Sequence, residues 1–229
     1  MSSITTAFVL GAGLGTRLRP LTADCPKPLL LLRGKPMVEY VFAHLADSGV
    51  RRFIVNTHHA AARWTEQFPD GQWRGLPLLF RHEPLLLGTA GGLKNVADLI
   101  GGETIFLHSG DVVTDLPLAP LLAAHADHDA EVTLALRDSA TRAIGVDADG
   151  VVRGVGASAA DARLAWHDYA NVAIVSARFL QRIPDIRPRG LAEIWRGMTG
   201  SGALRGTVIN SGEWHNIGTL EEYAKFNHG

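Results

Sequence analysis

Hydrophobic and polar positions follow two alternating periods along the first half of the chain. Ile4–Leu10 is mostly apolar and β-branched, which predicts a short buried strand. Apolar residues with helical spacing then predict a helix between Pro36 and Gly49. The same patterns predict strands at Phe53–Asn56, Leu78–His82 and Thr104–Leu107, a helix at about His59–Phe68, and a helix that follows a glycine-rich loop at residues 88–92 and runs to about Ile100. Such alternation is typical of a parallel sheet covered by helices.

The second half of the chain has a less regular pattern. We expect strands at Val132–Leu136 and Val172–Val175, and a hairpin that turns at Asp149-Gly150. Helices are expected at Leu191–Met198 and Leu220–Phe226, with a loop at Trp214–Thr219 between the last strand and the last helix. The elements together predict one α/β domain over residues 1–229.

Composition narrows the class of ligand. Of 229 residues, 46% are hydrophobic, and 22 basic residues nearly balance 23 acidic ones. This balance argues against a nucleic-acid surface built on bulk charge and leaves any anion affinity to a local site. The sequence shows no signal peptide and no membrane span, and its single cysteine, Cys25, excludes an internal disulfide and a cysteine-rich zinc site. We expect a cytoplasmic protein that binds a small ligand.

A glycine-rich segment after the first strand carries most of the chemistry. It reads Gly-Ala-Gly-Leu-Gly-Thr-Arg-Leu-Arg-Pro-Leu-Thr from residue 11, and Pro-Lys-Pro-Leu follows from residue 26. Glycines allow positive φ and let backbone N–H groups converge on an anion. Arg17 offers a rigid fork to two phosphate oxygens, and Lys27 is a point charge held between two prolines. The segment predicts a site for the phosphates of a nucleoside triphosphate.

Three other interpretations of these glycines fit less well. A Walker A loop needs Gly-Lys followed by Ser or Thr, which is absent. A dinucleotide site needs G-x-G-x-x-G and an acidic residue after the next strand, whereas this chain has G-x-G-x-G and a strand that ends in the amide of Asn56. A glycine turn without a ligand leaves Arg17 and Lys27 unexplained.

Three later segments complete a constellation. They are the glycine-rich loop at residues 88–92, Gly110-Asp111, and Trp-His-Asn-Ile-Gly-Thr at residues 214–219. With the first loop, they resemble the sugar-1-phosphate nucleotidylyltransferases nearly from end to end, in a short single-domain form, and most strongly over Gly11–Leu31. The resemblance implies an α/β fold, a Rossmann-like three-layer sandwich with a mostly parallel, mixed sheet of the nucleotide-diphospho-sugar transferase type.

The implied reaction joins an NTP to a sugar 1-phosphate, giving an NDP-sugar and pyrophosphate, with Mg²⁺ as cofactor. Residues up to about 130 would form the nucleotide-binding half, and residues from about 131 to 229 the sugar-phosphate-binding half. By this resemblance the catalytic residues are Arg17 and Lys27, and the nucleotide-binding residues are Gly11, Ala12, Gly13, Gly15, Thr16, Gly88, Thr89 and Gly91. Gly145 and Asn171 would meet the sugar phosphate, and Asp111 and Asn216 the metal.

Simpler explanations exist for two of these positions. Asp111 after a glycine also fits an ordinary turn or helix cap, and residues 88–92 also fit a loop that only packs well. Asn216 is a departure, because the family pattern W-x-D-x-G-T has an aspartate there as second metal ligand. An amide offers Mg²⁺ a neutral oxygen without a negative charge, so we expect weaker metal binding than an aspartate would give.

The sequence leaves two alternatives for the nucleobase and the sugar of the substrates. The Leu-Gly-Thr-Ala-Gly run resembles mannose- or heptose-1-phosphate guanylyltransferases, while residues 191–193 and the chain length resemble N-acetylmuramate-1-phosphate uridylyltransferases. The expected partners are therefore GTP or UTP and a sugar 1-phosphate, with neither a nucleic acid nor a membrane, and a homodimer is one option. Two rivals are a non-catalytic regulator that binds a nucleotide or sugar phosphate, and a Rossmann-type oxidoreductase.

Overall fold

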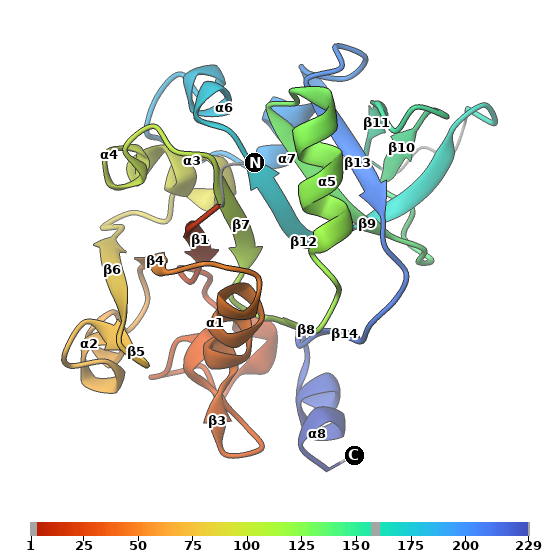
Figure 1. The fold of residues 1–229 in the computed structure, drawn as a ribbon. Helices are drawn as coiled ribbons and strands as arrows, with labels where there is room; N and C mark the ends of the chain where they lie inside the picture. The colour runs from red at the N-terminus through yellow and green to blue at the C-terminus, as the bar shows by residue number, and fades with distance from the viewer. Residues whose placement is uncertain (1–3, 157–160, 229) are drawn as a thin grey trace.

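A ten-stranded sheet forms the centre of the computed structural model, which describes residues 4–156 and 161–228. Its strands are β1 (Thr6–Leu10), β4 (Arg52–Thr57), β5 (Gln72–Trp73), β6 (Leu76–His82), β7 (Ile105–Ser109), β9 (Val132–Arg137), β10 (Ile144–Val146), β11 (Val152–Val155), β12 (Ala165–Val175) and β13 (Leu204–Val208). The main path runs β11-β10-β12-β7-β1-β4-β6-β5, with β9 beside β12 and β13 beside β9 (Figure 1). Both halves of the chain therefore share one sheet.

Strands β7, β1, β4 and β6 are parallel, as the alternating pattern of the first half predicted. Leu10 at the end of β1 is in register with Asn56 on β4 and with Ser109 on β7. Parallel strands end at the same edge of a sheet, which is where ligands bind in open α/β folds. The register therefore brings the first glycine loop, the end of β4 and the Gly110-Asp111 pair together.

The second half adds mainly antiparallel strands. Strand β12 pairs antiparallel with both β7 and β9, and β13 then pairs parallel with β9. Strands β10 and β11 form the predicted hairpin, in which Gly150 has a φ of +77° and its N–H donates to Asp147 O at 3.0 Å. The sheet is mixed, with parallel pairing in the first half and between β9 and β13.

Helices cover both faces of the sheet and complete three layers (Figure 1). They are α1 (Met37–Asp47), α2 (Ala62–Gln67), α3 (Gly88–Asn95), α4 (Ala97–Ile100), α5 (Ala119–His128), α6 (Ala177–Arg182), α7 (Leu191–Arg196) and α8 (Leu220–His228). Two apolar clusters fill the space between the sheet and these helices. One contains Phe42 of α1 and Trp64 of α2, and the other contains Leu93 of α3 and Phe179 of α6. Alternate residues of β1 and β4 enter the two clusters, as side chains on a buried strand must.

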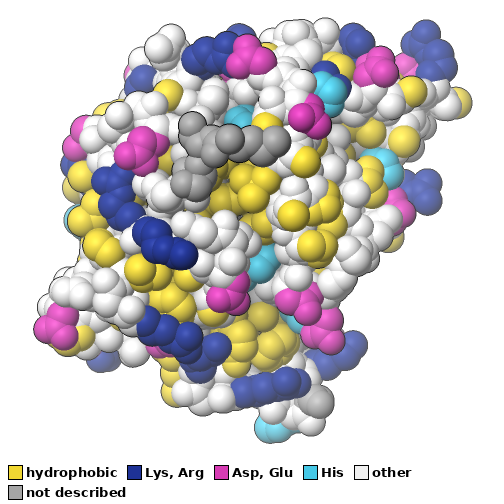
Figure 2. All heavy atoms as spheres, viewed as in Figure 1, with side chains coloured by type: hydrophobic (Ala, Val, Ile, Leu, Met, Phe, Trp, Pro, Cys, Tyr) yellow, Lys and Arg dark blue, Asp and Glu magenta, His cyan; other side chains and the backbone are white. Residues whose placement is uncertain are grey.

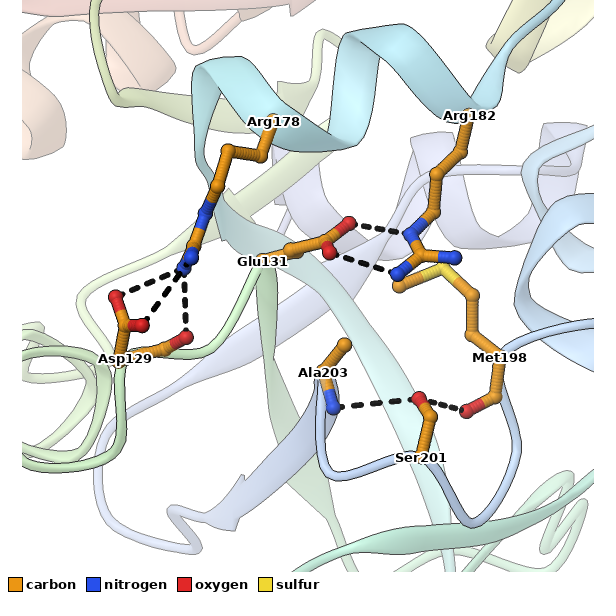
Figure 3. Close-up of polar contacts among 7 residues, drawn as sticks. All are labelled: Asp129, Glu131, Arg178, Arg182, Met198, Ser201 and Ala203. Atoms are coloured by element: carbon orange, nitrogen blue, oxygen red, sulfur yellow. Dashed lines mark hydrogen bonds and ion pairs between the residues drawn. The ribbon is translucent and has the colours of Figure 1, made fainter.

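The sequence patterns did not predict α5 and α6. Helix α6 is held by side chains on the segment that leads into β9, as Figure 3 shows: Arg178 pairs with Asp129 at 2.8 Å, and Arg182 pairs with Glu131. The Arg182 guanidinium lowers the pKa of the Glu131 carboxyl by hydrogen bonding. These contacts join residues about fifty positions apart, so no local pattern shows them.

The predicted loop at Trp214–Thr219 is wrong in its first half. Trp214–Asn216 forms a short strand, β14, which pairs antiparallel with β8 (Val112–Thr114). A three-residue strand has too little pattern of its own to predict, and its partner lies about a hundred residues earlier. Helix α8 then packs on the hairpin of β2 (Leu31–Leu32) and β3 (Lys35–Pro36), and the Tyr223 hydroxyl donates to Leu31 O at 2.8 Å.

The visible surface in Figure 2 mixes basic and acidic side chains with apolar and neutral ones, in keeping with the near balance of charge. Among residues 4–156 and 161–228, no helix has the length and apolar character needed to cross a bilayer.

Candidate active site

The first glycine loop, residues 11–16, leaves β1 at the edge where β4 and β7 also end. Gly15 has a φ of +59°, and open space surrounds Gly13 where a Cβ would stand. In the part of the chain that the structure describes, the backbone N–H groups of residues 12–16 donate no hydrogen bond. Gly11 differs, because it is buried and its N–H donates to Asn56 Oδ1 at 2.8 Å. The loop therefore has five N–H groups without an acceptor in the described chain, whereas the N–H of Gly11 is already used.

Lys27 lies directly against this loop. It begins a short 3₁₀-helix, Lys27–Leu29, and a Cβ on Gly15 would stand 3.0 Å from the Lys27 Cβ. The Lys27 ammonium contacts Asp111 Oδ2 at 2.5 Å and is largely buried. Asp111 is placed by Gly110, whose N–H donates to Leu10 O at 2.9 Å, so close that a side chain there would collide with this carbonyl.

The C-terminal segment closes the site. Asn216 pairs with Val112 in the β8–β14 ladder, and the next residue, Ile217, donates its N–H to Asp111 O at 3.3 Å. Arg17 lies beside Gly218, where a Cβ would stand 2.9 Å from a guanidinium nitrogen. The structure thus places Lys27 against the first glycine loop and Asp111 against Lys27. The C-terminal segment brings the backbone of Asn216 beside the residue after Asp111, and Gly218 beside Arg17.

Residues 88–92, the predicted second glycine-rich loop, are wrong as a loop: they form the first turns of α3 and pack tightly against residues 187–191. A Cβ on Gly91 would lie 2.2 Å from Arg187 O, and one on Gly88 would lie 2.7 Å from Arg189 O. Close packing therefore requires glycine at both positions, and at Gly88 the φ of +67° is a second reason for glycine.

Internal hydrogen bonds use part of this second loop. The N–H groups of Ala90 and Gly91 donate to Arg189 O at 2.9 and 3.4 Å, and the Thr89 hydroxyl accepts from Leu191 N at 2.8 Å. Within the described residues, the N–H groups of Gly88 and Thr89 donate no hydrogen bond. A nucleobase would therefore find its backbone donors at Gly88 and Thr89, and Gly91 N–H would not be among them.

Two polar residues that the sequence analysis did not assign to the site connect the two loops. Asn56 is 2% exposed and Glu83 is fully buried, and their side chains are hydrogen-bonded at 2.7 Å. The sequence does give a signal for these residues, because a polar residue lies at the end of each of two successive predicted strands. It does not show that Asn56 and Glu83 contact each other, because that requires the two strands to be placed side by side.

A cleft of about 700 Å³ lies between β14, α8 and the loop that follows β9. Its lining includes Arg33, Thr141, Asp168, Asn216 and Lys225, so it adjoins the predicted metal ligand. The two predicted sugar-phosphate residues lie elsewhere. Gly145 is buried in β10, where a Cβ would stand 3.0 Å from the Trp166 ring, and Asn171 accepts a hydrogen bond from the Ser109 hydroxyl at 3.3 Å.

Oxygen donors for a hard cation are few but suitable in kind. The described residues hold no group of three or more His, Cys, Asp and Glu side chains fit for a metal. Asp111 offers a half-buried carboxylate whose second oxygen is free of the Lys27 contact, and the β8–β14 ladder pairs Asn216, which carries an amide oxygen, with the residue after Asp111. Mg²⁺ binds through one or two protein oxygens plus waters and substrate phosphates, so this donor set fits it if phosphates complete the shell.

Behind the site, two histidines pack ring to ring in the core. His108 on β7 is fully buried and lies 5.9 Å from His44 on α1, between ring centroids. Burial lowers the pKa of His108 to about 3, and it lowers the pKa of His44 as well. His108 Nδ1 donates to Ser109 O at 2.7 Å, which binds the ring to the strand that leads to Asp111.

The chain is similar to known proteins over its first two thirds. The family model described as nucleotidyl transferase matches residues 6–145. Mannose-1-phosphate guanylyltransferase of Mycobacterium tuberculosis is 39% identical over 130 residues, which are 57% of this chain and 36% of that protein. N-acetylmuramate alpha-1-phosphate uridylyltransferase of Neisseria meningitidis serogroup B is 35% identical over 111 residues, 48% of each chain. The matches thus span about a third to a half of these relatives.

Solved structures match over nearly the full length. HddC from Yersinia pseudotuberculosis, in complex with GMP-PN, superposes with a TM-score of 0.79 at 22% identity, covering 97% of both chains. UDP-glucose pyrophosphorylase of Acinetobacter baumannii gives a TM-score of 0.81 at 16% identity, covering 97% of this chain and 92% of the other. At these identities the likeness shows the fold.

Proposed function

The chain belongs to the nucleotidyl transferase family, and from that premise we propose that it is a Mg²⁺-dependent enzyme that converts an NTP and a sugar 1-phosphate into an NDP-sugar and pyrophosphate. One observation carries the proposal: the N–H groups of residues 12–16 lack acceptors in the described chain beside two cations and a carboxylate. Backbone donors with a nearby Arg and Lys form a site for a polyphosphate.

In this reaction a phosphate oxygen of the sugar 1-phosphate attacks the α-phosphorus. A new P–O bond forms there, and the bond to the β-phosphate oxygen breaks and leaves pyrophosphate with its electron pair. The loop amides and Arg17 would hold the leaving pyrophosphate. Lys27 would lie between the two reacting anions and lower their repulsion, so catalysis is by positioning and charge compensation.

Asp111 and Asn216 would hold the Mg²⁺ ion. The bound ion would supply positive charge that offsets the charge of the triphosphate. In the free protein, Asp111 pairs with Lys27, so the carboxylate also fixes the ammonium that would meet the substrate.

For the substrates, we propose GTP and a mannose- or heptose-type 1-phosphate. Support comes from the relative named a mannose-1-phosphate guanylyltransferase and from the GMP-PN complex of the structural neighbour. The cleft beside Asn216 is the candidate place for the sugar, because Thr141 and Asp168 provide polar groups there. The alternative pair is UTP and N-acetylmuramate 1-phosphate, which a second relative supports.

A second candidate function is a non-catalytic nucleotide or sugar-phosphate sensor. Asn216 favours it, because an amide in place of a carboxylate weakens a metal site. Such a protein would bind nucleotide without releasing pyrophosphate.

The deciding experiment measures pyrophosphate release with each of GTP, UTP, ATP, CTP and dTTP against a panel of sugar 1-phosphates. We expect turnover with GTP or UTP, and a loss of about 10²-fold in kcat/KM for Arg17→Ala and for Asp111→Ala. Arg163→Ala is the matched control, because its side chain is 89% exposed and its ion partner is a neighbour in the chain. Binding of a nucleotide or sugar 1-phosphate without release of pyrophosphate would favour the sensor, and no binding of any NTP or sugar 1-phosphate would refute both functions.

A further inference from the structure

We infer that Asn56 and Glu83 form a buried hydrogen-bonded relay that fixes the first glycine loop relative to the second, and that both are positioning residues for the nucleotide. The inference rests on the proposed function, since the loops matter only if they hold one ligand between them. Neither side chain needs to touch that ligand.

The relay runs through four groups. Gly11 N–H donates to Asn56 Oδ1 at 2.8 Å, and Asn56 Nδ2 donates to Glu83 Oε1 at 2.7 Å. The other carboxylate oxygen, Glu83 Oε2, accepts from Leu87 N at 2.9 Å. Gly11 opens the first loop and Leu87 precedes the second, so the chain of hydrogen bonds ends on both.

The polarity of the relay has one solution. The Glu83 carboxylate offers only acceptors, and both groups that face it are donors. The Asn56 amide must then point its NH₂ toward Glu83 and its oxygen toward Gly11, because the reverse orientation would oppose two acceptors at one end and two donors at the other. Each buried polar atom of the relay has its partner, which such atoms require.

Gly92 and Gly11 pack closely against the residues of the relay. A Cβ on Gly92 would lie 2.7 Å from Glu83 Oε1 and 2.8 Å from Asn56 Nδ2. A Cβ on Gly11 would lie 2.8 Å from Asn56 O. Glu83 is also anchored by its backbone, since its N–H donates to Thr57 O at 2.8 Å and its carbonyl bonds the His58 ring at 2.7 Å.

This arrangement assigns roles to the backbone groups around it. Because Gly11 N–H is held by Asn56, the N–H groups of the first loop that have no acceptor among the described residues begin at Ala12. Because Leu87 N–H is held by Glu83, the unpaired donors of the second loop begin at Gly88. The relay therefore sets the distance between the group that would hold the phosphates and the group that would meet the base.

The test exchanges the amide of Asn56 and the carboxylate of Glu83. Asn56→Asp places one carboxylate against another, and Glu83→Gln leaves either Asn56 Nδ2 or Leu87 N facing an NH₂ group. The double variant N56D/E83Q restores every donor to an acceptor and keeps the net charge of the parent. We expect each single variant to raise the KM for GTP or UTP at least about fivefold, with the KM for the sugar 1-phosphate changed less than twofold. The double variant should return to within about threefold of the parent.

A matched control lies near the end of β6, two residues before Glu83. Arg81→Gln removes the surface ion pair between Arg81 and Asp98, and it should leave the nucleotide KM unchanged. Single variants with the parental nucleotide KM, or a double variant no better than the sum of the singles, would overturn the relay.

Amide hydrogen exchange separates this outcome from failure of the proposed function. In the nucleotide-free protein, the amides of Gly11 and Leu87 should exchange slowly, faster in each single variant, and slowly again in the double variant. If the parent releases no pyrophosphate with any substrate pair, the proposed function fails, and the exchange pattern alone decides on the relay. Exchange that is not rescued in the double variant overturns it.

Discussion

At the scale of single residues, the chemistry of the site depends on the small set of oxygens around the Lys27 ammonium. Asp111 is the one carboxylate that contacts this ammonium in the described chain, and the β8–β14 ladder pairs Asn216 with Val112, the residue after Asp111. In the proposed Mg²⁺ site, a neutral amide at position 216 would leave the charge of the ion to be offset mainly by Asp111 and by substrate phosphates.

Asn216→Asp tests this balance. The substitution adds a negative charge beside Asp111, so the Mg²⁺ concentration for half-maximal turnover should fall about tenfold. Turnover is measured as pyrophosphate release during a Mg²⁺ titration. Asn95→Asp at the end of α3 adds the same charge outside the site and should leave the titration unchanged. An unaltered Mg²⁺ dependence in Asn216→Asp would remove this residue from the metal site, and an inert parent revived by it would mark a degenerate enzyme.

At the scale of elements, the second glycine-rich loop and residues 187–191 behave as one unit. Four hydrogen bonds connect them, among them Arg189 N to Leu87 O at 2.9 Å and Ala90 N to Arg189 O at 2.9 Å. Glycine is needed at positions 88 and 91 because the backbone of the later segment occupies the space of a side chain.

Gly91→Ala should therefore destabilise the fold. A Cβ 2.2 Å from Arg187 O forces the two segments apart, at a cost of about 1–3 kcal/mol that exceeds the gain from replacing glycine inside α3. Gly13→Ala is the matched control, because nothing lies within 4 Å of its Cβ position, and it should change stability by less than about 0.5 kcal/mol. Urea unfolding measures both. Equal stability of the two variants would contradict the packing role of Gly91.

At the scale of the whole molecule, the pairing of β12 with β7 joins the two halves of the chain across a single sheet. Val172 on β12 is opposite His108, whose ring stands in the core against His44. Two neutral histidines are thus built into the layer behind the candidate site.

These histidines make stability depend on pH. The folded pKa of His108 is about 3, below its ordinary value of 6.5, so between these values the unfolded chain binds a proton that the native protein does not. The contribution of His108 to the free energy of unfolding is therefore fully present above about pH 6.5. It is lost as pH falls toward 3, by up to about 1.4 kcal/mol per pH unit. The lowered pKa of His44 acts in the same direction.

Urea unfolding at pH 7.5 and 5.0 measures this dependence. The parent should lose stability at the lower pH, and His108→Gln should lose less between the two conditions. His82→Gln removes an exposed histidine on β6 and should behave as the parent. A drop of equal size in all three proteins would assign the pH dependence to other groups.

Much of this architecture is local and could be read from the chain. Each predicted strand range overlaps one of β1, β4, β6, β7, β9 and β12, because a buried strand is marked by a run of apolar residues in the sequence. The chemistry of the first loop is local too, since glycine spacing and the cations Arg17 and Lys27 stand within twenty residues. What the sequence determined by itself is the α/β class and most of its elements; phosphate binding by the first loop is its prediction for the site.

Other features depend on residues that meet only in the folded chain. Helix α6 needs partners about fifty residues away, and β14 needs β8 about a hundred residues earlier. The Asn56–Glu83 relay and the contact of Arg187 with Gly91 also have no sequence pattern of their own. The tertiary structure alone decided which N–H groups stay free for a ligand, because a backbone donor is free only when no distant part of the chain supplies its acceptor.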